Sequence, residues 1–260
     1  MTAIGSCDPE ERDDQFENIK SLRKQYEAEG WPVLSVDTKK KEFLGGLYRD
    51  GKLYCMDGKP LKRFDHDFPY LAEGKVVPHG IYDVVNNSGF ITLGTSAETP
   101  GFVAECIRGW WNYRGRHDYP GCERLLLLMD GGGANSHRVH QFKREMIRLA
   151  TQIGLEIRIA HYPPYCSKWN PIEHRLFPHV TRSLQGVFLD SAETMKSYIN
   201  ERANTTTGLI TRAYILDKEF EYGYKDDVAL PDGFPLVRAD ILPKWNYTCH
   251  PCPEYSRLLN

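Results

Sequence analysis

The stretch that most constrains the fold is Leu125–Asn135, which reads LLLLMDGGGAN. A short apolar run bounded by glycines is typical of a central strand buried on both faces. The run ends in Asp130, which places this carboxylate at the carboxyl end of a core strand, where open α/β sheets bind ligands. The glycines that follow permit a sharp turn or a close approach to a ligand. Taken alone, Asp130 could equally be only a turn residue.

Asn135 follows the glycines and is expected to cap a helix that begins near His137. Its side chain could instead orient a phosphate or a metal-bound water, but capping is the simpler role.

Composition bounds the class of protein. With 260 residues, 41% of them hydrophobic, the chain can bury one large core with appended terminal segments. A net charge of −2 favours no class of partner, although local basic patches could contact phosphates. The seven cysteines are scattered without a disulfide framework, which favours a reducing cytoplasm. No apolar stretch approaches the roughly 20 residues that cross a bilayer, so a soluble, unsecreted protein without a membrane partner is expected.

Periodicity and turn residues predict an N-terminal helix, a strand, a hairpin and then alternating helices and strands. The expected helices are Asp13–Glu29, one from Pro100 that ends before the polar stretch RGRHDYPG, His137–Ile153, one from Pro171, and Ser191–Ala203. The expected strands are Val33–Asp37, the hairpin strands Ile81–Val85 and Phe90–Leu93, Leu125–Asp130, Leu155–His161 and Leu209–Leu216, with a further hairpin signal at Asp50-Gly51.

Antiparallel strands followed by α/β units are the plan of a ribonuclease H-like fold, a mixed central sheet with helices on both faces. We expect three parts: an N-terminal helical segment over 1–30, the ribonuclease H-like catalytic domain over 31–205, and a C-terminal extension over 206–260. The extension shows little regular pattern after its first strand.

Three carboxylates are placed where they could meet. Asp37 and Asp130 each end a predicted core strand, and Glu173 lies in the first turn of a helix. If the two strands are neighbours, the acids converge, and such a cluster repels itself unless hard cations such as Mg²⁺ or Mn²⁺ neutralise it. Two such ions can activate an attacking oxygen and stabilise a departing one at phosphorus, so the substrate class is a phosphodiester. The structural alternatives are a turn cap for Asp37 and a helix-dipole role for Glu173.

Four ordered motifs resemble the DDE transposases of the ISAzo13 insertion-sequence type. They are VDTKKKE at Val36, MDGGGANSHR at Met129, YPPYCSKWNPIEHRLF at Tyr162 and TTTGLITRA at Thr205. The resemblance runs from about Asp13 to the region of Leu230. It implies a ribonuclease H-like core in which Asp37, Asp130 and Glu173 bind two Mg²⁺ (or Mn²⁺) ions, nick transposon ends with water, and join the freed 3′-hydroxyl to target DNA. It also implies DNA as the partner and a homo-oligomer on that DNA.

The sequence departs from this family pattern in two places. The turn before the Glu motif reads PPGTS in the family and Pro163-Pro164-Tyr165-Cys166-Ser167 here. The family also carries a long N-terminal helix-turn-helix region, whereas about 36 residues precede Asp37, so we expect a catalytic part without that region. Two alternatives stay open: a stand-alone ribonuclease H-like nuclease, and an inactive DNA-binding or oligomerising remnant.

Residues around the acids are candidates for support or DNA contact. Lys39 and Lys40 could follow a DNA backbone, although solvated surface positions explain them equally well. Trp169 and Tyr165 could stack on an unpaired base, although aromatics beside prolines usually pack. The other candidates are Asn135, Lys168, Asn170 and Arg175, together with the basic residues Lys41, Arg138, Lys143, Arg144 and Arg148.

Two further clusters compete as metal sites. Asp65, His66 and Asp67 follow no core strand, and Cys249 and Cys252 form a lone CxxC without a second ligand pair, which we interpret as incidental.

Overall fold

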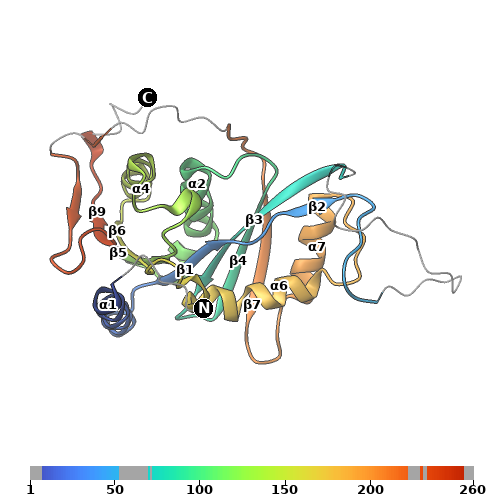
Figure 1. Ribbon diagram of the computed structural model, residues 1–260, viewed down its shortest axis with the longest axis horizontal. Helices are drawn as coiled ribbons and strands as arrows, with labels where there is room; N and C mark the ends of the chain where they lie inside the picture. The colour runs from blue at the N-terminus through green and yellow to red at the C-terminus, as the bar shows by residue number, and fades with distance from the viewer. Residues whose placement is uncertain (1–7, 53–69, 71, 222–228, 231–232, 255–260) are drawn as a thin grey trace, which may run out of the picture.

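A computed structural model describes residues 8–52, 70, 72–221, 229–230 and 233–254, and its centre is one nine-stranded sheet (Figure 1). The strand order is β7-β4-β3-β1-β5-β6-β9-β8, and β2 pairs with β3 beside this path. The strands are β1 Val33–Thr38, β2 Glu42–Leu44, β3 Gly74–Asp83, β4 Ser88–Gly94, β5 Arg124–Met129, β6 Glu156–His161, β7 Ile210–Leu216, β8 Leu236–Arg238 and β9 Asn246–Cys249.

Within the sheet, β3 runs antiparallel to both β1 and β4, while β5 and β6 run parallel to β1. The central order β4-β3-β1-β5-β6 with these directions is that of a ribonuclease H-like fold, which confirms the expected fold class.

Helices cover both faces of the sheet. In Figure 1, α2 and α4 lie above the strands, and α1 and α6 lie below them. The α-helices are α1 Pro9–Glu29, α2 Pro100–Trp110, α3 Arg116–Asp118, α4 His140–Ile153, α5 Pro171–Arg175, α6 Phe177–Ser183 and α7 Ala192–Arg202. Short 3₁₀ turns occupy Gly133–Asn135 (η3) and Ser167–Trp169 (η4), and a π-helical turn occupies Trp111–Gly115 (η2).

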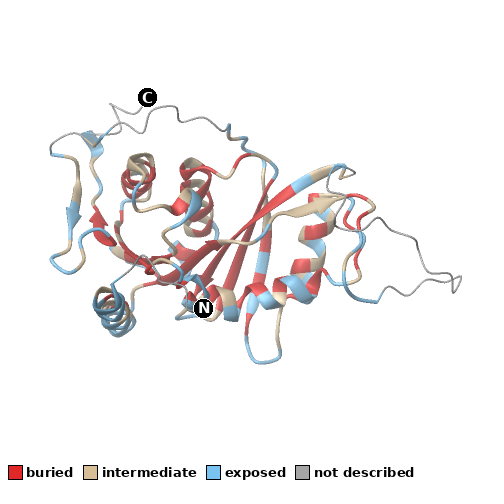
Figure 2. Ribbon diagram, viewed as in Figure 1, coloured by how far each residue is buried: buried red, intermediate tan, exposed pale blue. Residues whose placement is uncertain are grey.

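The all-apolar strand β5 supplies both faces of the core, as its sequence predicts. Leu125 and Leu127 join the core cluster beneath α2 and α4, whereas Leu126 and Leu128 join the cluster that α1 covers. A third cluster joins α5, α6 and α7 to β3, β4 and β7. Figure 2 shows the resulting continuous band of buried residues along the central strands.

The N-terminal helix is fixed to the sheet by a buried amide. Gln15 on α1 donates through Nε2 to the His161 carbonyl at 2.8 Å and to Asn246 Oδ1 at 3.0 Å. The helix begins at Pro9, earlier than expected, with Asp8 as its cap, and ends at Gly30, whose φ is +75°. The expected glycine stop is therefore confirmed.

Two local predictions were wrong. The fourth helix begins at His140 rather than near His137, and Asn135 does not cap it, because a 3₁₀ turn and a further turn intervene. The helix from Pro100 does not end before the polar stretch but continues as a π-helical turn through Gly115. The Trp110 and Trp111 rings lie so close to Gly115 that a side chain there would clash with them. The hairpin signal at Asp50-Gly51 lies beside residues 53–54, which are outside the described residues, so this hairpin stays a prediction; Glu42–Leu44 pairs with β3.

Stretches outside the predicted catalytic segment join the same sheet. The strand expected at Leu209–Leu216 is present as β7, parallel to β4. The structure adds β8 and β9 where the sequence shows no regular pattern, with β9 antiparallel to β6. The boundaries at residues 30 and 205 stay predictions. Asp65, His66 and Asp67 lie outside the described residues.

In the described part of the chain, no helix has both the length and the apolar character that a membrane span requires.

Candidate active site

The strand register brings Asp37 and Asp130 together. Val36 on β1 pairs with Met129 on the parallel strand β5, so the next residue of each strand is an Asp. Neighbouring strands lie about 4.8 Å apart, and successive side chains alternate between the two faces. Since Val36 and Met129 both point into the core beneath α2 and α4, the two carboxylates leave the sheet on the opposite face. This is the face that carries α1 and α5.

Glu173 is brought to the same place by a buried polar clamp. Asn170 accepts a hydrogen bond from the Ser35 hydroxyl and donates through Nδ2 to the Val36 carbonyl at 3.2 Å. Ser35 in turn accepts from the Ile172 amide at 2.9 Å. All these groups are buried, so the start of α5 is fixed against β1, two positions before Asp37. Ser35 was not singled out from the sequence, although a small polar residue inside an apolar strand was a usable signal.

Asp37 has the most perturbed carboxylate of the three. Burial first, then the charge of Asp130, raises the pKa of Asp37 to about 8. A hydrogen bond from the Thr38 amide, at 2.8 Å, opposes this rise, while the charge of Glu173 and a carboxyl–carboxyl hydrogen bond to it add to the rise. These interactions place the three predicted acids in one electrostatic cluster, in which Asp37 interacts with both of the others.

The Asp130 carboxylate accepts more hydrogen bonds that stabilise its charged form than the Asp37 carboxylate does. Burial raises its pKa, and hydrogen bonds from the Asn135 side chain and the Gly132 amide oppose the rise. Asn135 is only 3% exposed, and its Oδ1 has no hydrogen-bond partner among the described residues. Asn135 is therefore a carboxylate partner rather than a helix cap. The charge of Glu98, which precedes the Thr99 cap of α2, also raises the pKa of Asp130. Glu98 was missed, because only the tertiary contact between α2 and η3 reveals it.

A chain of two hydrogen bonds, called here the His161 relay, links Tyr247 through His161 to the main-chain carbonyl of Asp130. The Nδ1 of His161 lies 3.0 Å from the Asp130 carbonyl, and its Nε2 lies 2.8 Å from the Tyr247 hydroxyl. Burial lowers the pKa of His161 to about 3, so the ring is neutral. The neutral ring then donates from Nδ1 to the carbonyl and accepts the Tyr247 proton at Nε2. Strand β9 thereby supports the end of β5, a role that the sequence did not indicate for Tyr247.

A cavity of about 440 Å³ opens beside Asp130. Its walls are the glycine turn after β5 and the proline turn after β6, which includes Pro163 and Tyr165. Tyr165 occupies the position of the family's glycine and has a φ of +63°, a left-handed conformation that bulky residues rarely adopt. Its side chain is 82% exposed at the rim of this cavity.

The other predicted residues differ in how far they are exposed. Lys39 forms a largely buried ion pair with Glu42 at 2.6 Å, while Lys40 and Arg175 are exposed. Lys168 and Trp169 lie on η4, with the Lys168 ammonium 5.5 Å from the Trp169 ring centre. Trp169 is 59% exposed and contacts Phe16 of α1 edge-on. Asn170 is the clamp described above.

The donor set fits hard divalent cations. Three carboxylates interact with one another, with Asp37 buried and Asp130 and Glu173 partly buried. The buried Asn135 amide oxygen beside Asp130 is unpartnered within the described structure. As they stand, no three His, Cys, Asp or Glu side chains in the described ranges are grouped to hold a single ion, and this includes Cys249 and Cys252. The acids instead interact with one another in pairs, because the charge of Glu173 raises the pKa of both Asp37 and Asp130.

A sheet of this order, with acids at the ends of β1 and β5 and on α5, defines a ribonuclease H-like catalytic domain. The chain belongs to the ISAzo13-type DDE transposases, because the family model described as the Rhodopirellula transposase DDE domain matches residues 4–251.

Among solved structures, the chain is similar to three Mos1 complexes. The paired-end complex with the left transposon end is 15% identical with a TM-score of 0.47, over 77% of this chain and 56% of that chain. The mariner paired end complex with Mn is 16% identical with a TM-score of 0.46, over 77% and 58%. The Strand Transfer Complex is 16% identical with a TM-score of 0.48, over 77% and 57%. The chain thus matches little more than half the length of these proteins. No curated protein sequence matches.

Proposed function

We propose that this chain carries out metal-dependent DNA cleavage and strand transfer, with Asp37, Asp130 and Glu173 as the metal-binding acids. The convergence of these three carboxylates, expressed in the raised pKa of Asp37, is the observation that carries the proposal. Family membership supports the reaction class, because the matched family is a transposase DDE domain.

The three acids act together in this proposal. Asp37, Asp130 and Glu173 interact with one another, so these three carboxylates together would hold the divalent ions. Asn135 holds the Asp130 carboxylate in place, and Asn170 holds the helix that carries Glu173. When bound, two Mg²⁺ or Mn²⁺ ions supply the positive charge that activates the attacking oxygen and stabilises the departing one at phosphorus.

The experiment is nicking and joining of a labelled DNA duplex by the purified chain in Mg²⁺ or Mn²⁺. Asp130→Asn and Glu173→Gln remove the acids, and Asp14→Asn on the exposed side of α1 is the matched control. We expect activity in the parent and the control, and loss in both acid variants. Joined products support strand transfer, whereas nicked products alone favour a plain nuclease. A folded but inactive parent chain contradicts the proposal.

A further inference from the structure

A second cavity, of about 500 Å³, lies next to the acid site. Four parts of the chain line it: α1, the start of α4, the turn after β6, and the β8–β9 region. We call it the basic cavity, because Arg138, Lys143, Arg238 and Lys244 all line it. Among the described residues that line it, Glu11 is the only acid.

The cations of the basic cavity are held close together at an electrostatic cost. Lys244 bonds to Glu11 at 2.7 Å, so one positive charge is offset. Lys143 is only 3% exposed and lies 5.9 Å from the Tyr247 ring centre. The pKa of His137 falls to about 4, first through burial and then through the charges of Arg138, Lys143 and Lys244. A cavity of this potential is suited to an anion.

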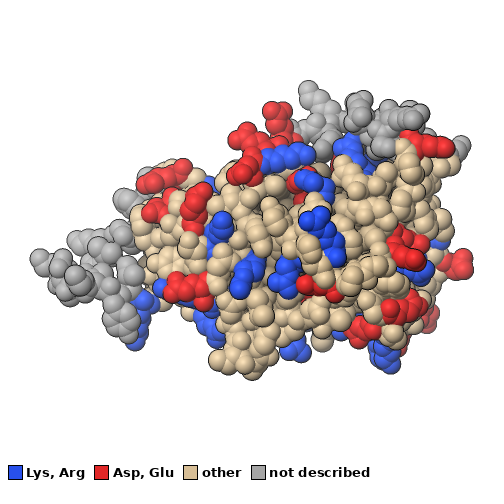
Figure 3. Space-filling view, turned by 180° about the vertical axis from the view of Figure 1, so that it is seen from behind, with Lys and Arg blue, Asp and Glu red and all other residues tan. Residues whose placement is uncertain are grey.

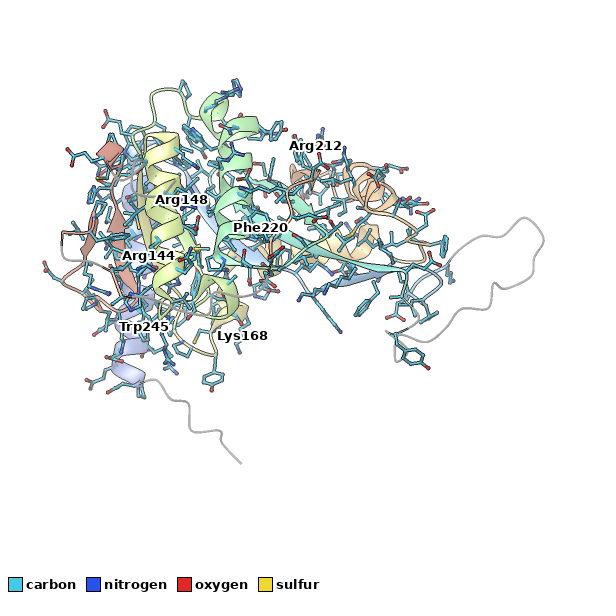
Figure 4. The ribbon with its side chains drawn as sticks, turned by 90° about the horizontal axis from the view of Figure 1, so that it is seen from above. Arg144, Arg148, Lys168, Arg212, Phe220 and Trp245 are labelled. Atoms are coloured by element: carbon cyan, nitrogen blue, oxygen red, sulfur yellow. The ribbon has the colours of Figure 1, made fainter. Side chains whose placement is uncertain are left out.

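The basic cavity adjoins the cavity at Asp130. His137, Arg138 and Pro164 line both of them. The cations of the basic cavity are therefore next to the place that an extended anion against Asp130 would occupy. In Figure 4, Lys168 on the acid-site side and Trp245 on the basic-cavity side lie along the same edge of the molecule. The opposite face, in Figure 3, shows acidic and basic side chains interspersed.

We propose that the basic cavity binds a backbone phosphate of the DNA strand whose scissile phosphate lies at Asp130. This inference rests on the proposed function for its substrate class. Arg238 presents five N–H donors, one of which bonds to the Pro243 carbonyl at 2.8 Å, so its fork suits phosphate oxygens. Strand β8, which the sequence pattern did not predict, thereby acquires a role in holding DNA.

The test measures binding without catalysis. Anisotropy of a fluorescein-labelled DNA strand and its duplex is recorded in EDTA over a range of salt concentrations, for the parent chain and for Arg238→Gln. Each lost phosphate contact lowers the salt slope by about 1 and weakens binding to all sequences alike. Arg238→Lys keeps the charge and should retain the slope. Arg212→Gln is the matched control, because Arg212 lies far from Trp245 in Figure 4.

A second variant changes binding in the opposite direction. Glu11→Gln removes this acid from the lining and releases Lys244, so the salt slope should steepen and Kd should fall several-fold. A purely structural role for Glu11 predicts no tighter binding.

The outcomes separate this inference from the proposed function. If Arg238→Gln and Glu11→Gln both leave the salt slope of folded protein unchanged, the inference is wrong even if the parent chain cleaves DNA. If the parent is inactive but the two variants shift the slope in opposite directions, the basic cavity stands and the proposed function fails. Inorganic phosphate that binds the cavity without competing with DNA would also overturn the inference.

Discussion

The two sides of the acid site are built differently. On the side of β1 and α5, buried side chains do the work, since Asn170 and Ser35 join helix to strand by hydrogen bonds. On the side of β5 and β6, two turns form an open cavity, and strained or glycine backbone shapes it. Only the first side has its polar groups paired almost completely.

One side of the site therefore positions the acids, and the other side leaves space for a ligand to reach them. The closed side fixes the helix that carries Glu173 relative to the strand that carries Asp37, through buried hydrogen bonds. The open side supports Asp130 through Asn135 and His161 while leaving space in front of it. Substitutions on the closed side should therefore cost stability, whereas those on the open side should change binding with little loss of stability.

The largest expected effect is on catalysis. Asp37→Asn keeps the shape of the side chain and removes the carboxylate that interacts with both other acids. We expect DNA cleavage to fall on the order of 10²–10³-fold or more, because charge stabilisation in the transition state is lost. Cleavage rates for Asp37→Asn and Asp14→Asn measure this. Activity near that of the parent would remove Asp37 from the site.

Disruption of the closed side should be costly for folding. Asn170→Ala leaves Ser35 and the buried Val36 carbonyl without their partner, so the free energy of unfolding should fall by about 2–3 kcal/mol. Denaturant unfolding of Asn170→Ala, Ser35→Ala and the double variant measures the coupling. Because the two residues share one clamp, the double variant should cost less than the sum of the single costs. Simple additivity would mean that they act separately.

The relay behind Asp130 should have a smaller effect. Tyr247→Phe removes the hydroxyl that donates to the buried Nε2 of His161, which costs about 1–2 kcal/mol of unfolding free energy. Tyr113→Phe, at a tyrosine that is 61% exposed, is the matched control and should cost almost nothing. Equal costs for both variants would show that the relay contributes nothing.

The smallest effect should be a gain in stability on the open side. Tyr165→Gly relieves a left-handed backbone conformation that costs roughly 1 kcal/mol for a residue with a side chain. Tyr165→Ala removes the ring but keeps the strain, so it separates the two contributions. We expect Tyr165→Gly to raise the unfolding midpoint and Tyr165→Ala to leave it lower than the glycine variant. A midpoint of Tyr165→Gly below that of the parent would show that the ring itself stabilises the turn.

The fold was largely predictable because it depends on local patterns. The run at β5 identified a strand buried on both faces, and an Asp at each strand end identified two of the acids before their register was known. Asn135 and Ser35 show the limit. Their roles depend on partners that lie far away in the sequence or beyond an unexpected turn, so no periodicity reveals them. Strands β8 and β9 were missed because they are short and pair only through tertiary contact.

The raised pKa of Asp37 determines how the stability of the folded chain changes with pH. The pKa of Asp37 is raised from 3.8 to about 8 in the folded chain, so folding favours its protonated form. Its stabilising contribution is therefore complete below about pH 4 and is lost as the pH rises to about 8. At neutral pH without metal, Asp37 must therefore take up a proton when the chain folds, a cost that Asp37→Asn lacks.

The most direct test is the unfolding free energy of the parent and Asp37→Asn at pH 7, with EDTA and with Mn²⁺. In EDTA, we predict that Asp37→Asn is more stable than the parent by about 1–3 kcal/mol, a partial return of the energy stored in the raised pKa. Mn²⁺ should stabilise the parent strongly and the variant little. A variant no more stable than the parent, together with no effect of Mn²⁺ on either, would contradict a shared acidic site for divalent cations.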